Sequence, residues 1–300
     1  YVKRPFGEKL NASFDFLKEN WKLLLKFTTY LLLPLCLIQA LSLNGLMSGA
    51  LSISAIASST AMAASSSSLI AFGSYYGLYM FLYLIGIILL TSLVYGLIRT
   101  YNEREERLQG VTLGMLKPRL FRNIKRLLLM TGACMLLVLF VGIFVGLLVA
   151  LTPFTLFLTI PFIIAFSVPL ALLAPIYLFE DITLMEAFKK TFRLGFATWG
   201  GVFLILIVMG IIASVLQGIV SIPWYVIYIV KMIFTMSDGG ATSSSVGLNF
   251  AQYLFSILML YGSYLSAIFG IVGLVYQYGH ASEVVDSITV ESDIDNFDKL

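Results

Sequence analysis

Two clusters of basic side chains lie close to long apolar segments, where lysine and arginine can bind anionic groups. One cluster precedes an apolar segment that starts near residue 127, and the other precedes one that starts near residue 198. A base beside a membrane contributes roughly 1 kcal/mol toward anionic headgroups, and tryptophan prefers the same boundary. The candidate lipid- or partner-binding residues are Lys117, Arg119, Arg122, Lys125, Arg126, Lys189, Lys190, Arg193, Trp21 and Trp199.

Motifs for catalysis or metal binding are missing from the sequence. The two cysteines, Cys36 and Cys134, lie inside apolar segments, which is typical of buried thiols. His280 is the only histidine and has no cluster of ligands around it that would complete a metal site. A nucleophile elbow, a Walker loop, an HExxH motif and intramembrane carboxylate pairs do not occur. We therefore expect no enzyme activity, no metal, no cofactor and no proton-coupled transport.

The composition is that of a polytopic membrane protein. Hydrophobic residues make up 59% of the 300 residues, charged residues only 12%, and the mean hydropathy is +0.95. Soluble domains carry about 25% charged residues, and a membrane-spanning helix needs about 20 apolar residues. We predict an all-α integral membrane protein with one membrane domain over 1–280 and an acidic tail over 281–300. Its six spans are 23–46, 74–98, 127–151, 155–179, 198–221 and 250–278.

The distribution of basic residues predicts the orientation of these spans. Of the 19 lysines and arginines, only Lys231 falls on one side of a six-span topology, and the rest fall on the other side. Because basic connections remain in the cytoplasm, both termini are predicted to be cytoplasmic. The acidic tail would then face the basic segment 99–126. Both an attraction between them, weakened by screening over about 8–10 Å, and a solvated tail remain open.

A repeated amphipathic pattern precedes three of the spans. In 6–21 and again in 184–199, large apolar residues recur every three or four positions and end in tryptophan, which predicts a helix with one apolar stripe. Thr183 and Glu186 fit a capping box at the start of the second copy. A weaker copy at 112–129 contains Pro118. The pattern predicts interfacial helices before spans 1, 3 and 5, which serve either to brace their hairpins or to bind lipid or a partner.

Two segments carry the resemblance of this chain to known proteins. The segment TIPFIIAFSVPLALLAPIYLFEDITLMEAFKKTFRLGFATWGGVFLI (159–205) resembles the central part of bacterial six-span membrane domains of unknown function. That group includes the membrane domain attached to some glycerophosphodiester phosphodiesterases. The segment FGEKLNASFDFLKENWKLLL (6–25) is similar to their opening part. The resemblance implies a six-span fold, a bacterial inner membrane location and a relation to lipids.

The fourth span contains three prolines, Pro161, Pro169 and Pro175. Proline removes a backbone donor and clashes with the preceding turn, so the span should be kinked or broken. Broken helices hold substrates in some transporters. We name the three prolines as candidate hinge residues, and either helix packing or a substrate cavity would explain them.

Small residues recur at four-residue steps in two spans and predict close helix packing. They are Gly142 and Gly146 in the third span, and Gly262, Ser266 and Gly270 in the sixth. The partner helix belongs either to this chain or to a second copy. Seven polar residues would form hydrogen bonds inside the bundle or line a polar cavity: Gln39, Asn44, Gln217, Gln252, Tyr253, Tyr261 and Tyr264.

The connection between the fifth and sixth spans has two parts. Its first part, 222–234, is apolar with one lysine and predicts an interfacial or re-entrant helix. Its second part, SDGGATSSSVG, is rich in glycine and serine and predicts a loop.

These features favour a non-enzymatic membrane scaffold, or a subunit of a larger membrane complex, that contacts partners or anionic lipid through its cytoplasmic face. The alternative is a transporter or flippase for a lipid or another amphiphile, based on the proline-rich span. A third hypothesis, that the protein is a lipid-modifying enzyme, is supported only by the resemblance. The expected partners are membrane lipids, other membrane-protein subunits or a second copy of the chain, and not nucleic acid.

Overall fold

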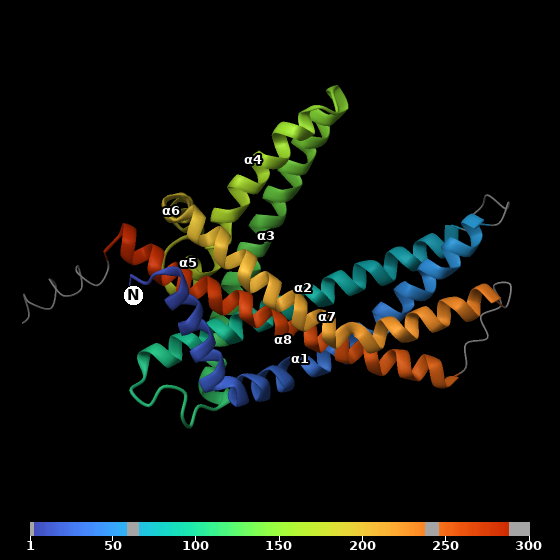
Figure 1. Cartoon of the computed structure of the whole chain (residues 1–300), viewed down its shortest axis with the longest axis horizontal. Helices are drawn as coiled ribbons and strands as arrows, with labels where there is room; N and C mark the ends of the chain where they lie inside the picture. The colour runs from blue at the N-terminus through green and yellow to red at the C-terminus, as the bar shows by residue number, and fades with distance from the viewer. Residues whose placement is uncertain (1–2, 59–65, 238–245, 288–300) are drawn as a thin grey trace, which may run out of the picture. The chain divides into compact units, whose positions relative to one another are not determined.

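The protein is all-helical over the residues that its structure describes. The structure is a computed structural model that describes residues 3–58, 66–237 and 246–287. Within these ranges there are helices and connections but no strand, which confirms the all-α prediction. The helices, drawn in Figure 1, are α1 (Phe6–Ser58), α2 (Ser66–Glu103), α3 (Leu113–Leu151), α4 (Thr155–Leu170), α5 (Leu173–Phe179), α6 (Leu184–Ala197), α7 (Trp199–Ser237) and α8 (Val246–Val285).

Six helical segments of the described chain are long and apolar enough to cross a membrane, which confirms the predicted number of spans. These segments are Phe6–Ala50, Leu69–Glu103, Leu113–Leu151, Thr155–Phe179, Trp199–Phe234 and Val246–Val285. Five of them are longer than the predicted spans because the helices continue into the polar flanks, and the fourth has its predicted bounds. A backbone in hydrocarbon must satisfy its own hydrogen bonds, and a continuous helix does so.

Only one of the three amphipathic segments forms a helix of its own, which is α6. Residues 6–21 are the first part of α1, and 112–129 largely form the first part of α3. Between Gly7 and Pro34 the sequence has no glycine or proline, so nothing ends the helix before the span begins. The predicted interfacial or re-entrant helix at 222–234 was likewise wrong, because α7 passes through Pro223 without a break. Most of the predicted loop after it lies outside the described residues.

The start of α6 has the predicted capping box. The hydroxyl of Thr183 accepts a hydrogen bond from the backbone N–H of Glu186 at 3.3 Å. The Glu186 carboxylate accepts in return from the Thr183 backbone N–H at 2.9 Å. These hydrogen bonds hold the pKa of Glu186 below its ordinary value. The box satisfies backbone donors at the point where the chain leaves the fourth span.

The described helices divide between two compact units. Unit 1 comprises Tyr1–Trp21, Thr91–Ile211 and Phe269–Leu300, and unit 2 comprises Lys22–Leu90 and Ile212–Ile268. The single membrane domain over 1–280 stays a prediction. The core of unit 1 is an apolar cluster around α5, α6 and the end of α8, in which the side chains of Leu172, Ile176 and Leu194 are fully buried.

The fourth span is broken in unit 1 between α4 and α5. The break lies at Ala171 and Leu172, two residues after Pro169, where the backbone forms two short-range turns. Pro161 lies within α4 without ending it, and Pro175 is the third residue of α5, where a backbone N–H has no intrahelical acceptor. Gly195 of α6 packs on the break, since a Cβ at Gly195 would lie 2.6 Å from the Cβ of Pro169. The break therefore rests on α6.

The small residues of the spans have different surroundings. In unit 2 a Cβ at Gly262 would lie 2.5 Å from Val220, so α7 and α8 approach closely there, and Ser266 is buried. In unit 1 a Cβ at Gly142, Gly146 or Gly270 would meet no described atom within 4 Å. Packing inside the chain thus explains Gly262, while a contact between copies through Gly142 and Gly146 stays a prediction.

Candidate functional site

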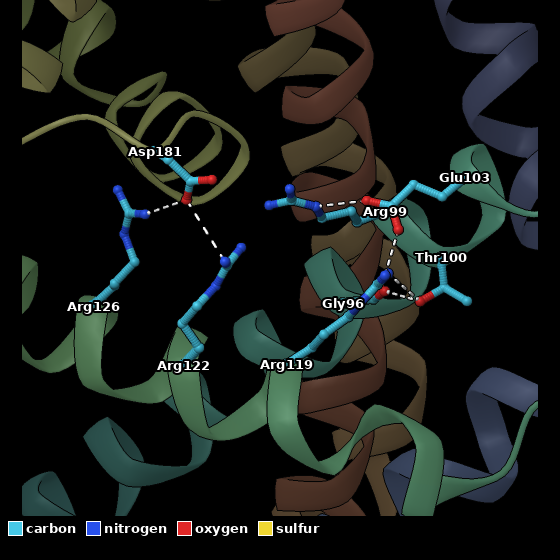
Figure 2. Close-up of polar contacts among 8 residues, drawn as sticks. All are labelled: Gly96, Arg99, Thr100, Glu103, Arg119, Arg122, Arg126 and Asp181. Carbon is cyan, nitrogen blue, oxygen red and sulfur yellow. Dashed lines mark hydrogen bonds and ion pairs between the residues drawn. The ribbon is translucent and has the colours of Figure 1, made fainter.

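The three candidate arginines of α3 lie against acids at the end of α2 and just beyond α5. Figure 2 shows Arg119 beside Glu103 and Thr100 of α2, with a hydrogen bond of 2.9 Å to the Thr100 hydroxyl and an ion pair with Glu103. Arg99 donates its Nε–H to the same Glu103 carboxylate at 2.8 Å. Glu103 is therefore shared by two guanidinium groups, which ties the end of α2 to the start of α3.

Arg122 and Arg126 lie one turn apart on α3, and both approach Asp181, just beyond α5. The distances from their guanidinium nitrogens to the Asp181 carboxylate are 3.7 Å and 3.1 Å (Figure 2). Arg126 also donates to the backbone carbonyls of Glu180 and Ile182, each at 2.9 Å, and stacks 4.2 Å above the ring of Tyr177. A cation that binds the carbonyls after a helix stabilises its C-terminal end. Arg126 thus holds α5 in place.

Lys190 of α6 joins two acids that are far apart in the sequence. Its Nζ lies 2.9 Å from Glu180 and 3.0 Å from Asp286, which follows α8. Arg193 reaches Asp286 at 2.6 Å, and the Tyr278 hydroxyl donates to Glu180 at 2.6 Å. Burial lowers the pKa of Lys190, but the hydrogen bonds and charges of the two carboxylates outweigh it and hold that pKa above its ordinary value. We call these residues the Lys190 network: Glu180, Lys190, Arg193, Tyr278 and Asp286.

Three of the candidate lysines make no ion pair with any residue that the structure describes. Lys117 and Lys125 of α3 and Lys189 of α6 are exposed, and the salt bridges of their neighbours do not include them. Trp21 is exposed as well, with 53% of its surface accessible. Trp199 instead donates its indole N–H to the Ala165 carbonyl at 3.0 Å, so it braces α7 against α4.

The sequence analysis missed the acids that neutralise the predicted binding residues. Glu180 and Asp181 directly follow the fourth span, and two adjacent acids among basic connections are the signal that points to them. An attraction of the tail to 99–126 was one of two open alternatives, and the tail residue Asp286 pairs instead with Lys190 and Arg193 of α6. The later tail acids, Glu291, Asp293, Asp295 and Asp298, lie outside the described residues.

Unit 2 contains a cavity of about 560 Å³ with a mixed polar and apolar lining. Its polar residues include Asn44, Lys231 and Gln252, and Lys231 donates to the side-chain oxygens of Asn249 and Gln252. Polar residues of the spans also form hydrogen bonds inside unit 2, such as Tyr264 to Gln39 at 2.9 Å. Hydrogen bonding within the bundle and a polar cavity, which were alternatives in the sequence, therefore both occur.

The predicted basic residues thus fall into an ion-paired set and a set of exposed lysines, both in unit 1. Comparison with known proteins found no matching family model, no matching curated protein and no matching solved structure.

Proposed function

We propose that the protein is a non-enzymatic membrane scaffold, or a subunit of a larger membrane complex, and that it contacts a partner or anionic lipid through exposed lysines of α3 and α6. We further propose a bacterial inner membrane location with both termini in the cytoplasm, based on the distribution of basic residues and on the resemblance stated above. The six apolar helices support a multi-pass membrane protein.

The observation that carries this proposal is the division of the basic side chains. Arg119, Arg122, Arg126, Lys190 and Arg193 pair with acids of the same chain and support a structural role. Lys117, Lys125 and Lys189 are exposed and keep their charge available for another molecule. We call these three the lysine face.

The spacing on α3 suits contact with a membrane surface. Lys117, Phe121 and Lys125 follow one another at four-residue steps, so they lie along one side of the helix. Phe121 is 56% exposed between the two lysines. A side with alternating bases and an exposed aromatic residue attracts anionic headgroups and inserts apolar surface beside them.

We expect the triple substitution Lys117→Gln, Lys125→Gln and Lys189→Gln to release the partner or anionic lipid that co-purifies with the wild-type chain. If each lysine contributes roughly 1 kcal/mol, binding should weaken by about two orders of magnitude. The measurement is a pull-down from the native membrane in mild detergent, read by native mass spectrometry.

The matched control is Lys18→Gln, Lys22→Gln and Lys26→Gln, which removes the same charge from exposed positions of α1. The control should retain the bound molecule. Equal losses in both triple variants would show a general charge effect and would contradict a specific lysine face.

A transporter or flippase for an amphiphile is the second candidate, and the cavity in unit 2 is the observation in its favour. The cavity places Lys231 and several amide side chains beside the apolar Ile38, Leu41 and Leu78, which fits a molecule with a polar head and an apolar part. Proteoliposomes with fluorescent phosphatidylglycerol should then show flipping that Leu41→Trp blocks by filling the cavity. Flipping at the rate of empty liposomes would reject this candidate.

A further inference from the structure

A second cavity, of about 520 Å³, lies in unit 1 where the ends of α2, α5 and α8 meet the N-terminal segment. Its charged lining residues are Arg4, Arg99 and Glu103, and its aromatic ones are Phe179, Tyr276 and Tyr278. None of these residues belongs to the lysine face. We call it the arginine cavity.

Arg4 has a fixed backbone and a guanidinium that makes no ion pair with the described residues. Its backbone N–H donates to Nδ1 of His280 at 3.1 Å. Its guanidinium carbon lies 5.5 Å from the ring centre of Tyr276, a cation–π distance. The aromatic contact holds the guanidinium in place but leaves its N–H donors unused, so Arg4 can donate to a ligand.

Arg99 is only partly satisfied by the protein. Its Nε–H donates to Glu103, while its Nη1 is buried and has no hydrogen-bond partner among the described atoms. A buried charged donor without an acceptor costs free energy. The carboxylate of Glu103 is also shared with Arg119. The cavity is thus lined by two guanidinium groups, those of Arg4 and Arg99, and by one carboxylate, that of Glu103, which Arg99 and Arg119 already neutralise.

The remaining lining of the arginine cavity is mostly apolar. Ile98, Val275 and Phe179 contribute side chains, and Phe179 stacks on Tyr278 with ring centres 6.0 Å apart. The volume exceeds what a single inorganic ion needs and suits a ligand that carries an anionic group on an organic body. Guanidinium groups match phosphate oxygens with two parallel hydrogen bonds.

We propose that the arginine cavity binds the phosphate group of an anionic ligand, with Arg4 and Arg99 as donors and the aromatic and apolar wall against the rest of the molecule. Such a phosphate belongs either to a phospholipid headgroup or to a soluble phosphate ester. The proposal goes beyond the proposed function and does not rest on it, because the two surfaces share no residue.

The test uses the purified full chain in nanodiscs and the variant Arg4→Gln, which breaks no ion pair of the described structure. The probes are phosphatidylglycerol, counted on the protein by native mass spectrometry against phosphatidylcholine, and glycerol 3-phosphate, measured by calorimetry. We expect Arg4→Gln to weaken binding at least about tenfold, since a hydrogen bond to a charged group is lost. Arg4→Lys should restore part of the affinity, because lysine keeps the positive charge but cannot donate two parallel hydrogen bonds to one phosphate.

Lys22→Gln is the matched control, since it removes one positive charge from an exposed position that lies outside both the cavity and the lysine face. It should bind both probes as the wild type does. Selective binding of phosphatidylglycerol identifies a lipid headgroup, and binding of glycerol 3-phosphate identifies a soluble ester. The proposal is overturned if the wild type binds neither probe, or if Arg4→Gln and Lys22→Gln weaken binding equally. The triple variant of the lysine face should still bind glycerol 3-phosphate if that is the ligand, which separates the two proposals.

Discussion

Replacing Lys190 with methionine is expected to lower the free energy of unfolding by about 2–3 kcal/mol. The substitution keeps the length of the side chain but removes the cation that lies 2.9 Å from Glu180 and 3.0 Å from Asp286. The Glu180 and Asp286 side chains are only 18% and 15% exposed, so water replaces the lost partner poorly. Breaking a fully buried pair costs about 3–5 kcal/mol and an exposed one at most about 1. The Lys190 network lies between these limits.

Lys189→Met is the matched control, one position earlier in α6. Lys189 is exposed and has no ion-pair partner among the described residues, so its loss should change the free energy of unfolding by less than about 0.5 kcal/mol. Thermal unfolding of both variants in the same detergent, followed by circular dichroism, gives the comparison. Similar melting temperatures for Lys190→Met and Lys189→Met would refute a structural role for the network.

The stability that Lys190 contributes, measured as the difference between wild type and Lys190→Met, should depend on pH in a defined direction. Although burial lowers the pKa of Lys190, its two carboxylate partners hold that pKa above the ordinary value. A raised pKa in the folded state stabilises the protein fully below the unfolded pKa, which is about 10.4 for lysine. The stabilisation is lost as pH rises through the folded pKa. The difference in stability between wild type and Lys190→Met should therefore stay constant through neutral pH and shrink only in strong alkali.

The spans could be read from the sequence because they depend on one local property. A run of about 20 apolar residues has to cross the hydrocarbon, whatever its neighbours are. The capping box at Thr183 and Glu186 was predictable for the same reason, since its partners are three residues apart. The separate helices expected at 6–21 and 112–129 were wrong because amphipathicity reports which side of a helix faces water, not where the helix ends.

The roles of the basic residues could not be predicted from their neighbours in the sequence. Arg126 and Asp181 are 55 residues apart, and Arg193 and Asp286 are 93 apart. The sequence shows that both signs of charge collect in connections on the predicted cytoplasmic side, but not which charges pair. Lys189 and Lys190 illustrate the problem. They are adjacent and chemically identical, yet the turn of α6 exposes the first and directs the second toward two acids.

The break in the fourth span yields the second large effect, at Gly195. A Cβ at this buried position would lie 2.6 Å from the Cβ of Pro169 in α4 and 2.7 Å from its Cα, and a proline ring and backbone cannot move aside easily. Gly195→Ala should therefore force α6 away from the break between α4 and α5. Overpacking of this kind costs about 1–3 kcal/mol, even though alanine is the better helix former.

Gly210→Ala provides a control of opposite sign. Gly210 lies in α7, and a Cβ there would meet no described atom within 4 Å. Without a clash, the gain in helix propensity should raise the free energy of unfolding by up to about 1 kcal/mol. Thermal unfolding should thus move in opposite directions for two identical substitutions. If Gly195→Ala is as stable as Gly210→Ala, α6 does not rest on Pro169. The break between α4 and α5 would then have no support from α6. The prolines of the fourth span would be better explained as a hinge, because only the contact with α6 distinguishes a packed kink from a movable one.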